Sequence, residues 1–263
     1  MIDLKNKKIL VTGGGGNGLA SGICSALDKL GAQLILNEIE EGCLNSVKAK
    51  YPHAYSIQAD ITKEDQVQAM FEEIENKIGV IDGLVNNAGV GLVKPAHEAT
   101  TSEFDGLYNI DVKGLWQVSK FYVTHLMKHK HIGNIVNISS IHASRTINKY
   151  AIYSSAKSAV EGLTRGMAME LGQYNIRVNS VGPGFVYSDQ NKVLLKALTN
   201  DVDQWISDHI NDYQAINNLM DPENCGNVVA FLLSDKSTGV TGQSIHVDYG
   251  TSTLLYSNRF IKE

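Results

Sequence analysis

The chain has 263 residues, 23 basic and 28 acidic side chains, a formal net charge of −5 and a hydrophobic fraction of 43%. That apolar fraction supports a full core and excludes disorder, and the mild acidity argues against a nucleic-acid binder, whose footprint would be basic. No apolar run approaches the roughly 18 residues of a membrane helix, and we expect no signal peptide. Three scattered cysteines predict a reducing, cytoplasmic setting without a disulfide framework or a metal cluster.

Short apolar runs alternate with helical patterns along the chain. The runs predict strands at residues 8–12, 33–36, 54–57, 81–86, 134–138, 177–181 and 244–247. Between them we expect a helix that ends at Gly31 and further helices at 41–50, 64–77, about 102–128 and about 153–174. Thr62, with Asp65 three residues later, resembles a capping box in front of the third of these helices.

Apolar strands separated by helices indicate an α/β fold, with a parallel sheet covered on both faces. We expect a single domain over residues 1–263, because no composition break marks a second. Segment 189–221 differs from the rest, since it holds six aspartates, two lysines and Trp205. It predicts a substrate lid; the alternative is a surface excursion without a role.

Glycines follow the first predicted strand. Residues 12–18, Thr-Gly-Gly-Gly-Gly-Asn-Gly, lie between a strand and a helix, where glycines let backbone N–H groups approach a pyrophosphate. Glu38, 20 residues after Gly18, stands where an acid accepts hydrogen bonds from adenosine ribose hydroxyls. Loop and acid together predict a dinucleotide site, whereas the loop alone could be an ordinary turn.

The same acid predicts which dinucleotide binds. A carboxylate repels a 2′-phosphate and pairs with a 2′-hydroxyl, and the nearby Asn17, Asn37 and Ile39 carry no positive charge. We therefore expect NAD(H) as the cofactor. The alternative is that Glu38 only faces solvent at a strand end.

Five motifs resemble the short-chain dehydrogenase/reductase family in order and spacing. They are Thr12-Gly13…Gly18, Asn86-Asn87-Ala88-Gly89, Ser140, Tyr153-x-x-x-Lys157 and Pro183-Gly184. The resemblance covers the chain from residue 3 to about 250, and residues 36–39 are weakly similar to gluconate 5-dehydrogenase and polyol dehydrogenase members. It implies a doubly wound Rossmann-type fold with a seven-stranded parallel sheet and a homotetramer or homodimer.

The resemblance also implies a role for each matching position. The implied catalytic residues are Ser140, Tyr153, Lys157 and, at the position of the family's Asn, Asp111. The implied cofactor contacts are Thr12, Gly13, Asn17, Gly18, Leu19, Glu38, Asp60, Ile61, Asn87, Ala88, Gly89, Tyr153, Lys157, Pro183, Gly184, Val186 and Ser188.

The sequence departs from the family pattern in three places. The glycine loop fits either with one extra residue, which puts Ala20 at the third glycine, or with Gly16 and Gly18 as the last two glycines. Asp111 replaces the usual Asn. Asp248-Tyr249-Gly250 replaces the more usual Asp-Gly-Gly.

The residue types themselves suit hydride transfer to or from a carbonyl. A phenol is a poor base at neutral pH, but Lys157, at i+4 from Tyr153, lies on the same helix face and favours the phenolate by charge. Ser140 can donate a hydrogen bond to the substrate oxygen. Taken alone, the Tyr–Lys spacing could be a surface pair. An ionised Asp111 cannot donate a hydrogen bond, and it would raise the pKa of Lys157, so we expect a retuned proton relay.

The remaining polar residues give weaker predictions. His125, His129 and His131 lie at a predicted helix end, where cations are favourable, and we expect no metal because no Cys or acid completes a ligand set there. For the substrate we name His142, Arg145, Asn148 and Gln190.

We therefore expect an oxidoreductase that transfers a hydride between NAD(H) and a secondary alcohol or ketone on a small polar substrate: a polyol, sugar, sugar acid or hydroxy acid. The alternatives are an NADPH-dependent 3-ketoacyl or steroid reductase, and a non-catalytic NAD-sensing module. We expect neither nucleic acid nor a membrane as a partner.

Overall fold

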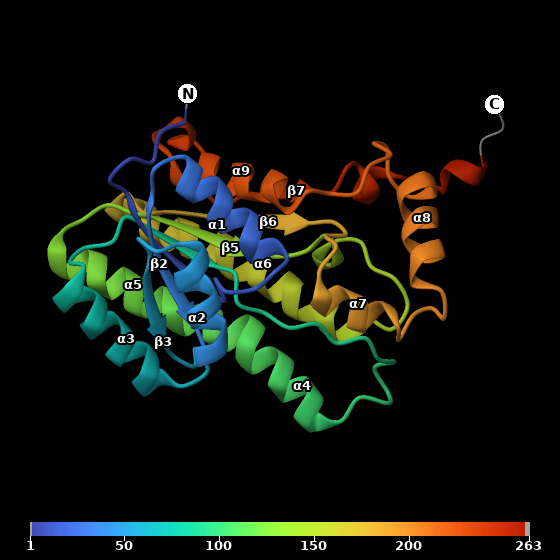
Figure 1. The fold of residues 1–263 in the computed structure, drawn as a ribbon, viewed down its shortest axis with the longest axis horizontal. Helices are drawn as coiled ribbons and strands as arrows, with labels where there is room; N and C mark the ends of the chain where they lie inside the picture. Colours follow the sequence, from blue (N-terminus) through green and yellow to red (C-terminus); the bar gives the residue numbers. More distant parts are fainter. Residues whose placement is uncertain (1, 261–263) are drawn as a thin grey trace.

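The structure, a computed structural model, describes residues 2–260, without the side chains of residues 189, 190 and 260. In this part of the chain a parallel sheet has the order β3-β2-β1-β4-β5-β6-β7 (Figure 1). The strands are β1 (Lys8–Thr12), β2 (Gln33–Glu38), β3 (Tyr55–Gln58), β4 (Gly83–Asn86), β5 (Asn134–Ile138), β6 (Arg177–Pro183) and β7 (Ser244–Val247). The expected seven-stranded parallel sheet is confirmed.

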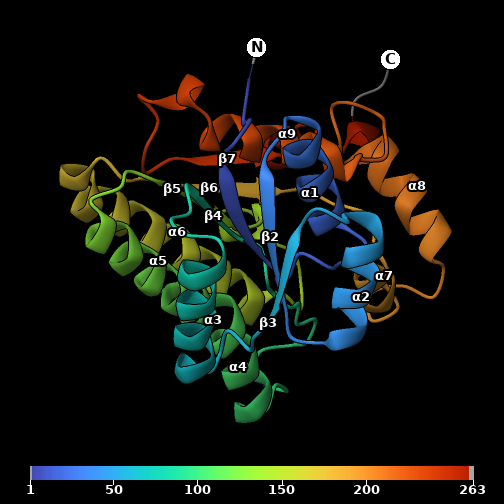
Figure 2. The ribbon, with the colours of Figure 1, turned by 60° about the vertical axis from the view of Figure 1, so that its left-hand side comes forward.

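Helices cover both faces of this sheet (Figures 1 and 2). They are α1 (Leu19–Lys29), α2 (Glu41–Lys50), α3 (Glu64–Lys77), α4 (Thr101–Tyr108), α5 (Leu115–His129), α6 (Ala151–Leu171), α7 (Asp189–Leu195), α8 (Val202–Asp212) and α9 (Pro222–Leu233). One core joins α1 and α9 to the sheet, and a second joins α3, α5 and α6 to its other face. The arrangement is the doubly wound one that the alternation of elements predicts.

Two glycines set how closely α1 and α9 pack. A Cβ on Gly22 would lie 2.2 Å from the carbonyl carbon of Pro222, and one on Gly226 would lie 2.4 Å from the backbone oxygen of Gly22. No side chain fits at these distances, so the two backbones touch. This contact fixes the start of α1, and with it the glycine loop that precedes the helix.

The expected capping box at Thr62 and Asp65 is wrong. Helix α3 begins after Lys63 without a side-chain cap, because Thr62 donates its N–H and its hydroxyl to Asp60 Oδ1, at 2.9 and 2.7 Å. The capping box lies at α4 instead, where Thr100 and Glu103 satisfy each other's backbone N–H groups. The Thr62 hydroxyl therefore binds the nearer carboxylate of Asp60 and does not cap the helix.

The long helix expected at 102–128 is present over residues 101–129, but it is not one regular α-helix. It consists of α4 and α5 joined by a π-helical turn, Asn109–Gly114. Such turns are rare and occur often at functional sites. This one carries Asp111, which it turns into the protein interior, where the residue is 1% exposed.

The carboxyl ends of β1 and β4 lie side by side, and the chain leaves them toward opposite flanks of the sheet. A crevice forms at such a switch point, and ligands bind there in open α/β sheets. Among the described residues no helix is long and apolar enough to cross a membrane.

Candidate active site

A cavity of about 1170 Å³ opens at the carboxyl edge of the sheet. Most of the sequence-derived site residues line it: Gly13, Asn17, Gly18, Leu19, Glu38, Asp60, Ile61, Asn87, Ala88, Gly89, Ser140, His142, Arg145, Tyr153, Lys157, Pro183, Gly184, Val186 and Ser188. Thr12 and Asp111 lie buried beneath the lining. Asn148 is not among the lining residues, and its Oδ1 accepts from the N–H of Lys149. The side chain of Gln190 lies outside the described residues.

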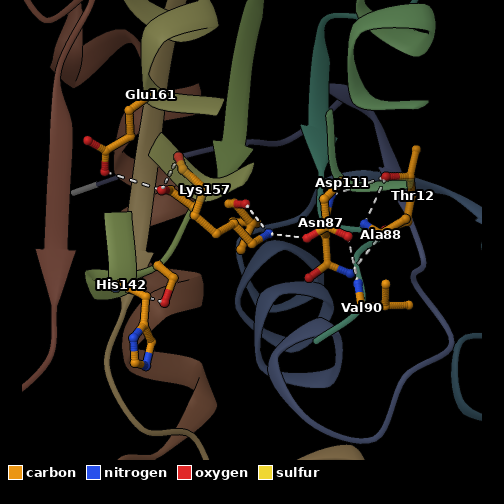
Figure 3. A network of polar contacts seen from close by, with 11 residues as sticks. Thr12, Asn87, Ala88, Val90, Asp111, His142, Lys157 and Glu161 are labelled. Carbon is orange, nitrogen blue, oxygen red and sulfur yellow. Dashed lines mark hydrogen bonds and ion pairs between the residues drawn. The ribbon is translucent and has the colours of Figure 1, made fainter. Parts of the chain in front are cut away.

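Partly buried hydrogen bonds fix the floor of the cavity. Thr12 Oγ1 accepts from the N–H groups of Asn87 and Ala88, both at 3.1 Å, and Asn87 Nδ2 donates to the carbonyls of Thr12 and Gly13 at 3.0 Å (Figure 3). Gly13 adopts a φ of +63°, and a Cβ there would lie 2.9 Å from Ala88 Cα. The ends of β1 and β4 are thereby locked together.

The glycine loop fits the first of its two alignments. Gly18 immediately precedes α1, and a Cβ there would lie 2.5 Å from Ser188 Cβ. Ala20 is buried in the first turn of α1, at the third-glycine position of that alignment. Gly16 has no such close neighbour, since its Cβ would approach nothing nearer than 3.5 Å. Gly18 is therefore the glycine that close packing requires.

Glu38 faces this loop from the end of β2. Its Oε1 accepts the N–H of Gly15 at 2.7 Å, and a Cβ on Gly15 would lie 3.0 Å from the Cγ of Glu38. The acid therefore does more than face solvent at a strand end. It is partly buried, lines the cavity, and holds a carboxylate at the rim beside the glycine loop.

Helix α6 carries both Tyr153 and Lys157. Lys157 is buried, with its Nζ 5.7 Å from the centre of the Tyr153 ring, and it donates to the carbonyl of Ile138 at 3.2 Å. Ser140 lies after β5, and its Oγ accepts the N–H of His142. The Ser139 hydroxyl contacts Glu161 at 3.2 Å (Figure 3). Both serines line the cavity, but the Ser139 hydroxyl donates to Glu161, whereas Ser140 Oγ only accepts within the described part of the chain, so the Ser140 proton is the one available to a substrate.

Asp111 forms an ion pair with Lys157. Its Oδ2 lies 3.0 Å from Lys157 Nζ, and its Oδ1 accepts the N–H of Val90 at 2.8 Å (Figure 3). Gly89 makes room for the pair, because a Cβ there would lie 3.2 Å from Asp111 Oδ2. Burial alone would lower the pKa of Lys157, but the charges of Asp111 and Tyr153 oppose it, and the net result is a raised pKa. Lys157 is thus held in its charged form.

Aromatic rings line the substrate side of Tyr153. His142 stacks on Tyr150 with ring centres 4.4 Å apart, and both meet the Tyr153 ring edge-on at 5.8 Å. Burial lowers the pKa of His142 to about 4, and its Nδ1 lies 3.0 Å from Thr146 Oγ1. At neutral pH His142 is therefore an uncharged hydrogen-bonding group, and Arg145 is the charged one of the expected pair.

The opposite wall comes from α7 and α8, which lie in the expected lid segment 189–221, and from the segment around Arg259, which the sequence did not indicate. Trp205 stacks on His209 at 5.1 Å, and Phe185 meets the Trp205 ring edge-on at 5.2 Å. Arg259, near the chain end, pairs with Asp208 at 2.7 Å and Asp212 at 2.5 Å. Its partners lie about 50 positions away in the sequence, so no local pattern could have shown the contact.

The cavity fits a nicotinamide dinucleotide. The backbone around Gly16 is open, while Gly13 and Gly18 leave room that side chains would fill. A single cavity runs from Glu38, past the glycine loop, to Tyr153 and Lys157. It offers backbone N–H groups at the start of α1 and a carboxylate at the rim, which are donors and acceptors of the kind that a pyrophosphate and a ribose require.

The expectation that no acid completes a ligand set near the histidines is wrong. Glu75, from α3, lies beside His125 and His129 of α5. It is 50 positions away from His125, and only the packing of the two helices brings it there. His131 is separate from this group, since its Nε2 contacts Asp82 Oδ1 at 3.1 Å.

Comparisons with known proteins find oxidoreductases of similar sequence and fold. A family model described as Enoyl-(Acyl carrier protein) reductase matches residues 14–252. Meso-2,3-butanediol dehydrogenase from Serratia marcescens is 32% identical over 249 residues, 94% of this chain and 95% of that protein. A 3-oxoacyl-(acyl-carrier-protein) reductase from Staphylococcus epidermidis is 32% identical over 250 residues, with 93% and 98% covered. The structure of a gluconate 5-dehydrogenase from Burkholderia cenocepacia, in complex with NADP and tartrate, superposes with a TM-score of 0.87 at 25% identity, covering 97% of this chain and 98% of that one.

Proposed function

The chain belongs to the short-chain dehydrogenase/reductase family of oxidoreductases acting on CH–OH groups, and we propose that it uses NAD(H) to interconvert a secondary alcohol and a ketone on a small polar substrate. Polyols, sugars, sugar acids and hydroxy acids are the substrates meant. The observation that carries the proposal is the cavity in which Glu38 lies at one end and Ser140, Tyr153 and Lys157 at the other.

The bound nicotinamide would supply or accept the hydride, while the residues of the chain handle the oxygen and its proton. Ser140 donates a hydrogen bond to the substrate oxygen, and Tyr153 takes the alcohol proton during oxidation and returns it during reduction. Lys157 stabilises the phenolate by its charge. Asp111 keeps Lys157 charged. Because its Oδ2 lies 3.0 Å from Lys157 Nζ, it also offsets part of the positive charge that acts on Tyr153. The proton relay is thus retuned by a carboxylate.

The polar groups around the reacting oxygen support a small hydroxylated substrate. His142, Thr146 and Ser252 line the cavity as hydrogen-bonding groups, and Arg145 adds a cation that suits a carboxylate. The gluconate 5-dehydrogenase above binds tartrate, itself a small hydroxy acid. We assign the role of a substrate lid to segment 189–221, because α7 and α8 line the cavity opposite Tyr153.

The choice of NAD(H) rests on Glu38. A carboxylate fixed at 2.7 Å from the N–H of Gly15 repels a 2′-phosphate. NADH and NADPH are titrated separately by fluorescence, and NADH binds at least about tenfold more tightly. Glu38→Ser weakens that preference, whereas Glu41→Ser, an exposed acid of α2, leaves it unchanged. NADPH binding as tight as or tighter than NADH binding overturns the assignment and favours the alternative, an NADPH-dependent 3-ketoacyl reductase.

Self-association is the remaining part of the proposal. Phe104, Trp116 and Met169 are large, apolar and between 41% and 83% exposed on α4, α5 and α6. The family resemblance implies a homodimer or homotetramer, and these side chains support a contact through that face. Light scattering of the purified protein gives two or four times the monomer mass; a monomer contradicts this part.

A further inference from the structure

The group Glu75, His125 and His129 bridges α3 and α5 at the end of the molecule away from α7 and α8 (Figures 1 and 2). None of the three lines the catalytic cavity. The geometry points to a site for a divalent transition metal ion of the zinc type, bound by two imidazoles and one carboxylate. We propose this site independently of the reaction above.

The three ligand atoms lie within 4.8 Å of one another, and one of their distances already suits a tetrahedral ion, while the longer one must shorten as an ion binds. Glu75 Oε1 lies 3.3 Å from His129 Nε2, and Glu75 Oε2 lies 4.0 Å from His125 Nδ1. With bonds near 2.0–2.2 Å, neighbouring ligand atoms of tetrahedral zinc lie about 3.3–3.5 Å apart. The two histidines occupy positions i and i+4 of α5, which puts them on one face of the helix. Three protein ligands leave a fourth position for water.

The buried ring of His125 independently supports a ligand at this site. His125 has a side chain only 3% exposed, and its Nε2 has no hydrogen-bond partner in the described part of the chain. Its Nδ1 is too far from Glu75 for a hydrogen bond. A buried imidazole without a partner is costly, and a metal ion at Nδ1, the ring atom that faces the carboxylate, would give the ring a partner while Nε2 carries the proton.

The ring of His125 is also held in place. It packs against Phe71 of α3 and against the ring of His129, with centres 6.2 and 5.0 Å away. Both imidazoles are therefore positioned before an ion arrives, and binding orders little else. The ligands come from two helices, so an ion here ties α3 to α5.

Lys128 holds the place of the cation in the absence of metal. Its Nζ lies 2.6 Å from Glu75 Oε1, but its side chain is 62% exposed and can turn into solvent. Two imidazole ligands favour zinc, copper or nickel, because magnesium and calcium prefer oxygen ligands. An ion entering between the imidazoles displaces the ammonium group from the carboxylate.

Zinc titration of the full chain tests the site, with a chromophoric chelator as competitor. The wild type binds one equivalent of zinc. In His129→Ala and Glu75→Gln the affinity for this ion falls by well over tenfold, because even residues that only hydrogen-bond to a metal ligand change the affinity by about 10- to 100-fold. Lys128→Ala binds zinc more tightly than the wild type. His131→Ala is the matched control. It removes a partly exposed histidine that contacts a carboxylate, that of Asp82, but has no third ligand nearby, and it binds zinc as the wild type does.

A structural readout separates the site from zinc bound elsewhere. Zinc raises the melting temperature of the wild type and of His131→Ala but not of Glu75→Gln, and cobalt gives the visible bands of a tetrahedral site only in the first two. Circular dichroism verifies that the variants fold. Zinc affinity unchanged in both His129→Ala and Glu75→Gln, or weakened in Lys128→Ala, overturns the proposal.

Discussion

The floor and the outer wall of the cavity are held in different ways. On the floor, Thr12, Asn87, Asp111 and Lys157 are bound by short contacts to backbone groups or to each other, largely out of contact with solvent. On the wall, the contacts that join α8 to the segment around Arg259 include two ion pairs of Arg259, whose side chain is 64% exposed.

The difference separates the chemistry from the choice of substrate. Buried contacts keep the proton-handling groups within a narrow geometry, which catalysis requires. Exposed ion pairs are weak and can open, as a wall through which substrates enter must do. The account therefore predicts large effects from changes on the floor and small ones from changes on the wall.

The largest expected effect on folding comes from Asp111→Ala. The variant leaves the buried ammonium of Lys157 without its partner, so the free energy of unfolding falls by about 3–5 kcal/mol. Urea denaturation measures it. The matched control is Asp105→Ala, an exposed acid of α4 that changes the value by no more than about 0.5 kcal/mol. Equal stability of the two variants would break the comparison.

The pH dependence of this loss follows from Lys157. Its folded-state pKa is raised above the ordinary 10.5, so the pair stabilises the fold fully below pH 10.5, and this contribution disappears as pH rises through the folded pKa. The gap in stability between the wild type and Asp111→Ala should therefore be constant near neutral pH and shrink in strong alkali. A gap that widens there contradicts the assigned ion pair.

A medium effect is expected on the pH–rate profile of Asp111→Asn. Without the carboxylate, the whole charge of Lys157 acts on the phenol of Tyr153, and the acidic limb of the oxidation profile moves to lower pH by roughly one unit. Without the charge of Asp111, the effect of burial on Lys157 is less opposed, so the pKa of Lys157 falls. The alkaline limb of the profile then also moves to lower pH. An unmoved profile shows that Asp111 does not couple to the catalytic pair.

The sequence could show most of the floor because its signals are local. Apolar runs marked the strands, and the spacing of Tyr153 and Lys157 is a property of one helix. The π-helical turn at residues 109–114 was not visible, because nothing in its residues distinguishes it from the helices on either side. Thr62 misled the capping prediction because Asp60, two residues before it, competes for the same hydroxyl.

The wall and the histidine group needed the structure. Arg259 meets Asp208 and Asp212, and Glu75 meets His125 and His129, only because distant helices pack together. Their sequence separation of 50 or so residues carries no pattern that periodicity or spacing rules can detect. The Arg259 ion pairs and the proposed metal site, unlike the strands, therefore depend on tertiary contacts.

The smallest expected effect comes from Arg259→Ala. The Arg259 side chain is 64% exposed but Asp212 is only 11% exposed, so the loss of both ion pairs lowers the free energy of unfolding by about 1–2 kcal/mol and the protein still folds. Without the ion pairs that Arg259 makes to α8, this helix moves away from the cavity more often. KM therefore rises a few-fold, while kcat changes less than twofold. Lys48→Ala, another exposed cation, is the control and alters neither constant. A collapse of kcat in Arg259→Ala would place this residue in the chemistry and not in the wall.

The central claim is tested most directly by NADH formation over a panel of polyols, sugar acids and simple secondary alcohols, with the wild type and Tyr153→Phe side by side. The account predicts turnover of at least one small polar alcohol by the wild type. In the variant the rate falls by about 10²- to 10⁴-fold, while NADH binding is retained. Turnover that survives in Tyr153→Phe would contradict the proton role of the tyrosine. NADH binding by the wild type without turnover across the panel would contradict the dehydrogenase reading and favour an NAD-sensing module.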